Sequence, residues 1–81
     1  MTFKDLKFIY RSSDDRTIRT ALKDLGNGYL FNVYLFLPSR LTKGSAGWNV
    51  RITNVQEQES IHKHNQSIEQ IDALLKEYSS K

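Results

Sequence analysis

The 81-residue sequence contains no cysteine, which excludes disulfides, thiolate metal sites and cysteine catalysis. Its one proline and four glycines build no linker, so we expect a single domain over residues 1–81. No apolar run approaches the roughly 20 residues that a membrane-spanning helix needs, and the N-terminus lacks a secretory signal. These absences predict a soluble protein of the cytoplasm, with no membrane partner.

Sequence motifs of catalysis are also missing. There is no glycine-rich phosphate loop, no nucleophile elbow and no paired-carboxylate signature. His62 and His64 lie two apart and would share one face of a strand, where both could bind a metal. A tetrahedral site needs further ligands, however, and neither cysteine nor a tight carboxylate cluster lies nearby in sequence. We therefore expect no metal, no cofactor and no catalytic residue.

The net charge of +3 is unevenly distributed. Residues 1–24 hold six basic and four acidic side chains, residues 25–56 hold three basic and no acidic ones, and residues 57–81 hold three basic and five acidic ones. A polyanion would therefore bind preferentially to the middle of the chain.

The densest apolar segment, residues 29–37, and the segment 48–55 both read as strands, because they are rich in β-branched and aromatic residues. Residues at odd positions of 29–37 form a continuous apolar face, whereas the even positions are mixed. Pro38 ends this strand because it has no N–H to donate, and residues 38–47 read as a loop.

The remaining elements are predicted from periodicity and caps. Residues 3–10 favour a strand, with a helix as the alternative. Residues 14–25 favour a helix, and the alternative is a strand that turns at Asn27-Gly28 into the next one. A weaker strand follows over residues 60–64, and Ser67 with Gln70 forms a capping box at the start of a C-terminal helix. The predicted fold is α+β, in the order β-α-β-β-β-α: an antiparallel three- to four-stranded meander with two helices packed on it.

The face opposite the apolar stripe is the candidate functional surface. In simple register it presents aromatic rings, amides and cations: Asn32, Tyr34, Phe36, Asn49, Arg51, Thr53, His62 and His64. Such a mixture is typical of single-stranded nucleic-acid platforms, on which bases stack and cations contact phosphates. The alternative is that a helix covers this face and makes Tyr34 and Phe36 ordinary core residues.

The predicted nucleic-acid-binding residues come from three places. The sheet supplies Tyr34, Arg51, His62 and His64, the loop supplies Arg40 and Lys43, and the predicted first helix and its approach supply Arg11, Arg16 and Arg19. The charged outer side of that helix has a simpler interpretation as a solvated surface, because aspartates are interspersed along it.

Three function classes remain. The first is a non-enzymatic binder of RNA or another single-stranded nucleic acid, together with a host protein or without one. The second is an inhibitor or adaptor that binds a host factor or a toxin. The third is a compact toxin-like ribonuclease, in which Arg51, His62, His64 and Tyr34 would act on a phosphate. In composition the chain resembles small accessory proteins of bacteriophages, which implies a counter-defence role in the cytoplasm of a host cell; the oligomeric state is left open.

Overall fold

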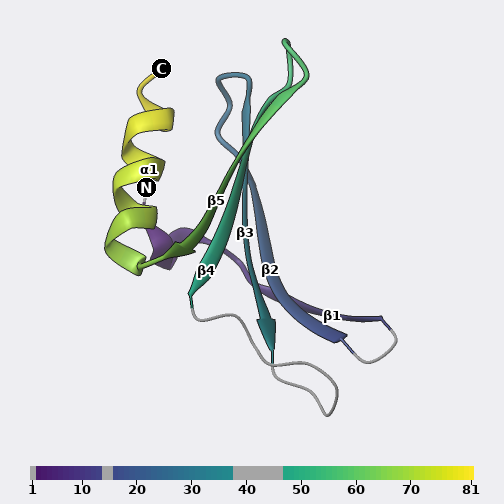
Figure 1. The fold of residues 1–81 in the computed structure, drawn as a ribbon. Helices are drawn as coiled ribbons and strands as arrows, with labels where there is room; N and C mark the ends of the chain where they lie inside the picture. The colour runs from purple at the N-terminus through teal and green to yellow at the C-terminus, as the bar shows by residue number, and fades with distance from the viewer. Residues whose placement is uncertain (1, 14–15, 38–46) are drawn as a thin grey trace.

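The structure is a computed structural model that describes residues 2–13, 16–37 and 47–81, with only the backbone of residues 13, 16 and 17. This part of the chain forms a five-stranded antiparallel sheet, in which each strand pairs with the next along the sequence. One α-helix packs against one face of that sheet (Figure 1). The elements are η1 (Phe3–Asp5, a 3-10 helix), β1 (Ile9–Ser13), β2 (Arg16–Asp24), β3 (Tyr29–Leu37), β4 (Trp48–Asn54), β5 (Glu59–Gln66) and α1 (Ile68–Ser79).

The helix predicted over residues 14–25 is wrong, because Arg16–Asp24 forms strand β2, between β1 and β3. Ala21 is 2% exposed beneath α1, whereas its neighbour Leu22 is 66% exposed on the other side of the sheet. This segment therefore carries apolar side chains on both faces of a strand, and their spacing resembles that of a helical stripe. Two neighbouring strands bond the backbone groups of β2, and this tertiary pairing overrides the local helical periodicity.

The alternative prediction for this segment, a strand that turns at Asn27-Gly28, is confirmed. Gly26 and Gly28 have φ angles of 77° and 93°, which side chains rarely tolerate and which the turn requires. The backbone N–H of Leu25 donates to the carbonyl of Tyr29 at 3.0 Å and closes the turn.

The first strand begins later than predicted. Residues Phe3–Asp5 form the 3-10 helix η1, and β1 starts only at Ile9. The Thr2 N–H donates to a carboxylate oxygen of Asp5 at 2.8 Å, which satisfies a backbone donor at the start of η1. The meander thus has five strands and one α-helix in place of three to four strands and two helices.

The other elements are confirmed, with small shifts in their bounds. Strands β3, β4 and β5 cover the three strands predicted from the middle of the chain. At the start of α1, Gln70 N–H donates to Ser67 Oγ at 3.1 Å and Ser67 N–H donates to Gln70 Oε1 at 2.8 Å, which is the predicted capping box.

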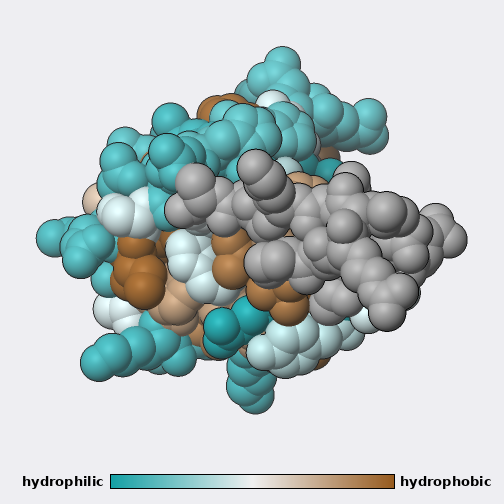
Figure 2. All heavy atoms as spheres, turned by 60° about the horizontal axis from the view of Figure 1, so that its bottom comes forward, coloured by the Kyte–Doolittle hydropathy of each residue, from teal (hydrophilic) through white to brown (hydrophobic). Residues whose placement is uncertain are grey.

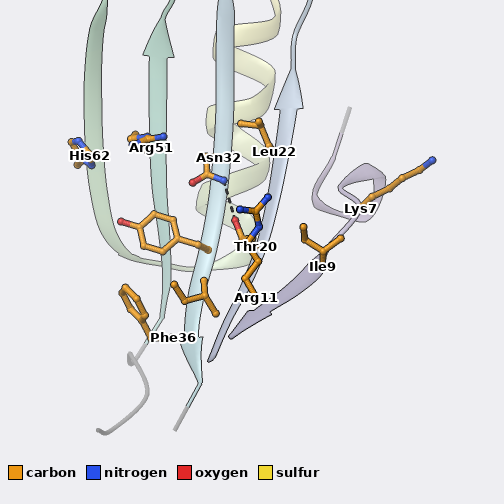
Figure 3. Close-up of a pocket in the computed structure, with 11 residues that line it drawn as sticks. Lys7, Ile9, Arg11, Thr20, Leu22, Asn32, Phe36, Arg51 and His62 are labelled. Carbon is orange, nitrogen blue, oxygen red and sulfur yellow. Dashed lines mark hydrogen bonds between the residues drawn. The ribbon is translucent and has the colours of Figure 1, made fainter. Parts of the chain in front are cut away.

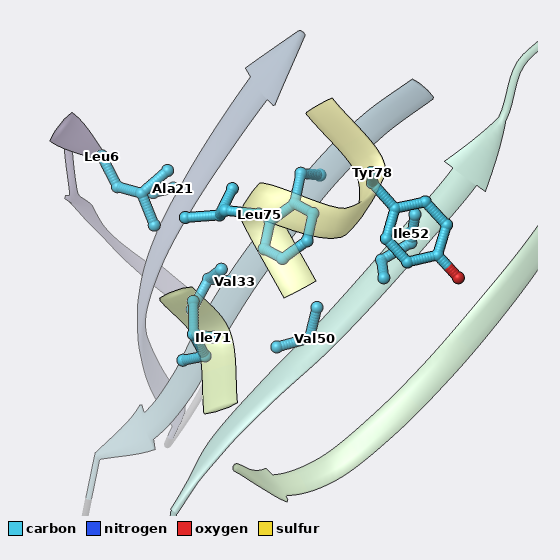
Figure 4. Packing of buried hydrophobic residues seen from close by; sticks show 9 residues of the cluster. Leu6, Ala21, Val33, Val50, Ile52, Ile71, Leu75 and Tyr78 are labelled. Atoms are coloured by element: carbon cyan, nitrogen blue, oxygen red, sulfur yellow. The ribbon is translucent and has the colours of Figure 1, made fainter. Parts of the chain in front are cut away.

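The core lies between α1 and one face of the sheet (Figure 4). Ile71 and Leu75 of α1 are fully buried against inward-facing residues of β3 and β4, namely Phe31, Val33, Val50 and Ile52. Residues at odd positions of β3 make this contact, as predicted, so the residues at even positions project to the opposite face. Because α1 lies on one side of the sheet, no helix of the described residues lies over that opposite face.

None of the helices in the described part of the chain has the length and apolarity needed to cross a bilayer.

Candidate functional site

The uncovered face of the sheet forms an open groove of about 620 Å³ (Figure 3). Strands β1 to β5 and the approach to β1 all contribute side chains to it. We call this feature the sheet groove; it is lined by Lys7, Ile9, Arg11, Ile18, Thr20, Leu22, Asn32, Tyr34, Phe36, Arg51 and His62. Figure 3 shows these side chains in front of the sheet and α1 behind it.

Two aromatic rings on β3 form one wall of the sheet groove. Tyr34 and Phe36 lie two residues apart on the same face, with ring centroids 5.6 Å apart and ring planes at 82°. Both side chains are half-buried, and both lie at even positions of β3, on the face opposite α1. The alternative in which a helix makes these residues core is therefore wrong, and both side chains line the sheet groove.

Aliphatic side chains occupy the β1 and β2 side of the sheet groove. Ile9 is 51% exposed and Leu22 is 66% exposed, and Ile18 lies beside them. Figure 2 shows apolar surface, in brown, between hydrophilic side chains on the side of the molecule that it presents. An apolar surface of this kind offers contact area to the flat face of a base or to the apolar side chains of a protein.

The charged residues that line the sheet groove are all basic. Lys7 and Arg11 lie on its β1 side, and Arg51 lies on β4. His62 on β5 is the cross-strand partner of Arg51, so the two side chains project to the same face. Since no carboxylate is among the described lining residues, the groove favours an anionic ligand.

A hydrogen-bonded amide lies at the centre of the sheet groove. Asn32 Nδ2 donates to Thr20 Oγ1 at 3.0 Å and to the carbonyl oxygen of Ala21 at 3.0 Å. These bonds tie β3 to β2 and hold the Asn32 side chain in one orientation.

The predicted binding residues are only partly brought together. Tyr34, Arg51, His62 and Arg11 all line the sheet groove. His64 does not line it; its Nδ1 lies 2.9 Å from Oδ1 of the buried Asn49.

The other predicted cations are located elsewhere or lie outside the described parts. Arg40 and Lys43 fall outside the described residues, and only the backbone of Arg16 is described, opposite Ser13. The side chain of Arg19 lies on the α1 side of the sheet, away from Tyr34 and Arg51.

Arg19 packs within an aromatic cluster. Its guanidinium carbon lies 4.8 Å from the ring centroid of Phe8 and 5.6 Å from that of Trp48. Phe3 completes the cluster, with its centroid 5.2 Å from Trp48. Arg19 Nε is buried and has no hydrogen-bond partner among the residues that the structure describes. These contacts explain Arg19 as a stabilising cation over aromatic rings.

The prediction missed the half of the sheet groove contributed by the N-terminal strands: Lys7, Ile9, Ile18, Thr20 and Leu22. The signal was present as the alternation of Ile18, Thr20 and Leu22 ahead of Asn27-Gly28. Assigning this segment to a helix placed these residues on the wrong element.

No group of three histidine, cysteine, aspartate or glutamate side chains that could hold a metal occurs within the described residues. No protein-family model, curated protein or solved structure matches the chain.

Proposed function

We propose that this protein is a non-enzymatic binder of single-stranded RNA, and that the sheet groove is its binding site. The observation that carries the proposal is the combination, on one uncovered face, of the Tyr34–Phe36 ring pair with cations on both sides and no described carboxylate. Unpaired bases stack on exposed rings, and the cations on either side contact the phosphates.

Single strands suit this surface better than a duplex. Reading the major groove of DNA usually requires a protruding helix. The exposed surface of α1 carries Glu69 and Glu77 against one lysine, Lys76, which disfavours contact with phosphates. A sheet with exposed rings, by contrast, stacks bases that are not already paired.

The test is a titration of a fluorescently labelled eight-nucleotide RNA with the purified protein at several salt concentrations. We expect binding that weakens with salt, with a log–log slope of roughly −0.7 for each phosphate contacted. A duplex DNA of the same length should bind more weakly. Absence of RNA binding at low salt would overturn the proposal.

The same mixtures test whether the protein is an enzyme. We expect the RNA to remain intact after prolonged incubation. Cleavage that disappears in His62→Ala would favour the ribonuclease hypothesis instead, since His62 and Arg51 are adjacent in the sheet groove.

A second candidate, an inhibitor or adaptor that binds an acidic protein, is favoured by one observation. Ile9 and Leu22 expose aliphatic surface next to the cations of the sheet groove, and aliphatic side chains contribute less to base stacking than rings do. Recovering the bound partners from cells, with and without nuclease treatment, distinguishes RNA binding from protein binding. Partners that survive nuclease treatment and are lost in Leu22→Asp would support the protein-binding role. The counter-defence role in a phage-infected cell stays a prediction from composition under either candidate.

A further inference from the structure

The amide of Asn32 has only one orientation that satisfies its surroundings. The carbonyl oxygen of Ala21 can accept a hydrogen bond but cannot donate one, so the amide nitrogen must face it. The second hydrogen of that nitrogen is donated to Thr20 Oγ1. Both donors of Asn32 are therefore used within the protein.

The remaining polar atom, Asn32 Oδ1, is an acceptor that faces the sheet groove. Figure 3 shows it pointing away from Thr20, on the side of Asn32 where Arg51 lies. None of the described residues donates a hydrogen bond to this atom, and Asn32 lines the sheet groove. The protein thus presents a fixed acceptor within a groove whose charged side chains are donors.

The position of this acceptor relates it to the proposed stacking ring. Asn32 and Tyr34 are two residues apart on β3 and face the same way, a separation of about 6.8 Å along a strand. A base that stacks on the Tyr34 ring would therefore have one of its edges close to Asn32 Oδ1. A fixed acceptor there requires an N–H on the base edge.

We infer that Asn32 is a specificity-determining residue, which selects a base with an exocyclic amino group at the position stacked on Tyr34. Adenine, cytosine and guanine carry such a group, whereas uracil has carbonyl oxygens at the corresponding positions. The N3–H of uracil lies between these two oxygens, and either oxygen would repel Asn32 Oδ1. This inference rests on the proposed function, because it names the kind of single-stranded RNA that the same site would select.

The experiment compares two eight-nucleotide RNAs that differ by one amino group. One is an oligouridine with a single central adenosine, and the other carries purine riboside at that position. We expect the wild-type protein to bind the adenosine RNA about 2- to 10-fold more tightly, which corresponds to one neutral hydrogen bond. In Asn32→Ala the two RNAs should bind equally.

Two further variants make the result specific. Asn32→Thr also removes the acceptor but supplies a β-branched residue that suits a strand, in case the alanine variant does not fold. Thr53→Ala is the control, because Thr53 is on the same face but does not line the sheet groove, and it should keep the preference.

Equal binding of both RNAs by the wild-type protein would overturn the inference and leave RNA binding intact. A preference that persists in folded Asn32→Ala or Asn32→Thr would also overturn it. Failure of the wild-type protein to bind either RNA would overturn the proposed function as well.

Discussion

The proposed RNA binding depends most on the ring of Tyr34. It is half-buried on the uncovered face, and its one described ring contact is with Phe36. Stacking of a base on such a ring contributes about 1–3 kcal/mol. The loss of its contact with Phe36 costs the fold about 0.5–1.5 kcal/mol beyond the loss of the buried area of the ring.

We therefore expect Tyr34→Ala to weaken RNA binding about 5- to 150-fold, while the protein remains folded. Fluorescence anisotropy measures the affinity, and thermal unfolding checks the fold.

Tyr10→Ala is the matched control for this variant. Tyr10 is 66% exposed, but it pairs with Arg19 and so lies on the other side of the sheet. Its removal should leave RNA affinity unchanged. If both variants weaken binding equally, the uncovered face is not the binding surface.

Two arginines on opposite faces give a second prediction. Arg51→Ala should weaken RNA binding and reduce the log–log salt slope by roughly 0.7, because one phosphate contact is lost. Arg19→Ala should leave both quantities unchanged and lower the free energy of unfolding by about 1 kcal/mol, because Arg19 stacks on Phe8 and Trp48. Salt-dependent titrations and urea unfolding measure the two effects. The reverse result would mean that Arg19 contacts RNA, as the sequence first suggested.

At the scale of elements, β3 and β4 were predictable from sequence and β2 was not. The alternation in residues 29–37 correctly placed Phe31 and Val33 in the core and Tyr34 on the opposite face. In strand β2 the alternation of Ile18, Thr20 and Leu22 is harder to recognise, because the uncovered face carries Ile18 and Leu22 where a solvated strand would carry polar residues.

The misassignment of β2 is itself informative about the site. When both faces of a strand carry apolar residues, the spacing of these residues along the sequence can match that of a helix. In β2 both faces carry apolar residues, although only one of them is packed against α1. The same property creates the aliphatic side of the sheet groove. Lys7 and Ile9 were missed as members of the site for a related reason, since their placement depends on how β1 pairs with β2.

Helix α1 stabilises the sheet through a few fully buried residues. We expect Leu75→Ala to lower the free energy of unfolding by about 2–5 kcal/mol, because it leaves a cavity in the core. Such a loss is a large part of the total stability of a small domain. Lys76→Ala, one residue along on the exposed side of α1, should change it by less than about 0.5 kcal/mol. Urea unfolding, followed by the fluorescence of Trp48, the single tryptophan, measures the free energy of unfolding of both variants. If Leu75→Ala changed it as little as Lys76→Ala, α1 would not dock on the sheet.

At the scale of the whole molecule, the fold separates the core from the proposed binding surface. One helix buries one face of the sheet, and the C-terminal third of the sequence, which includes that helix, carries the excess of acidic residues. The other face is open, and the charged side chains of its groove are basic. An anionic ligand is therefore attracted to the side of the sheet that does not build the core.

The most direct test of this arrangement is a two-dimensional ¹H–¹⁵N NMR titration with a single-stranded eight-nucleotide RNA. We expect the largest chemical-shift changes at residues that line the sheet groove, including Thr20, Asn32 and Arg51, and little change in α1. Changes concentrated in α1, or no changes at any RNA concentration, would contradict the proposal that the uncovered face binds RNA.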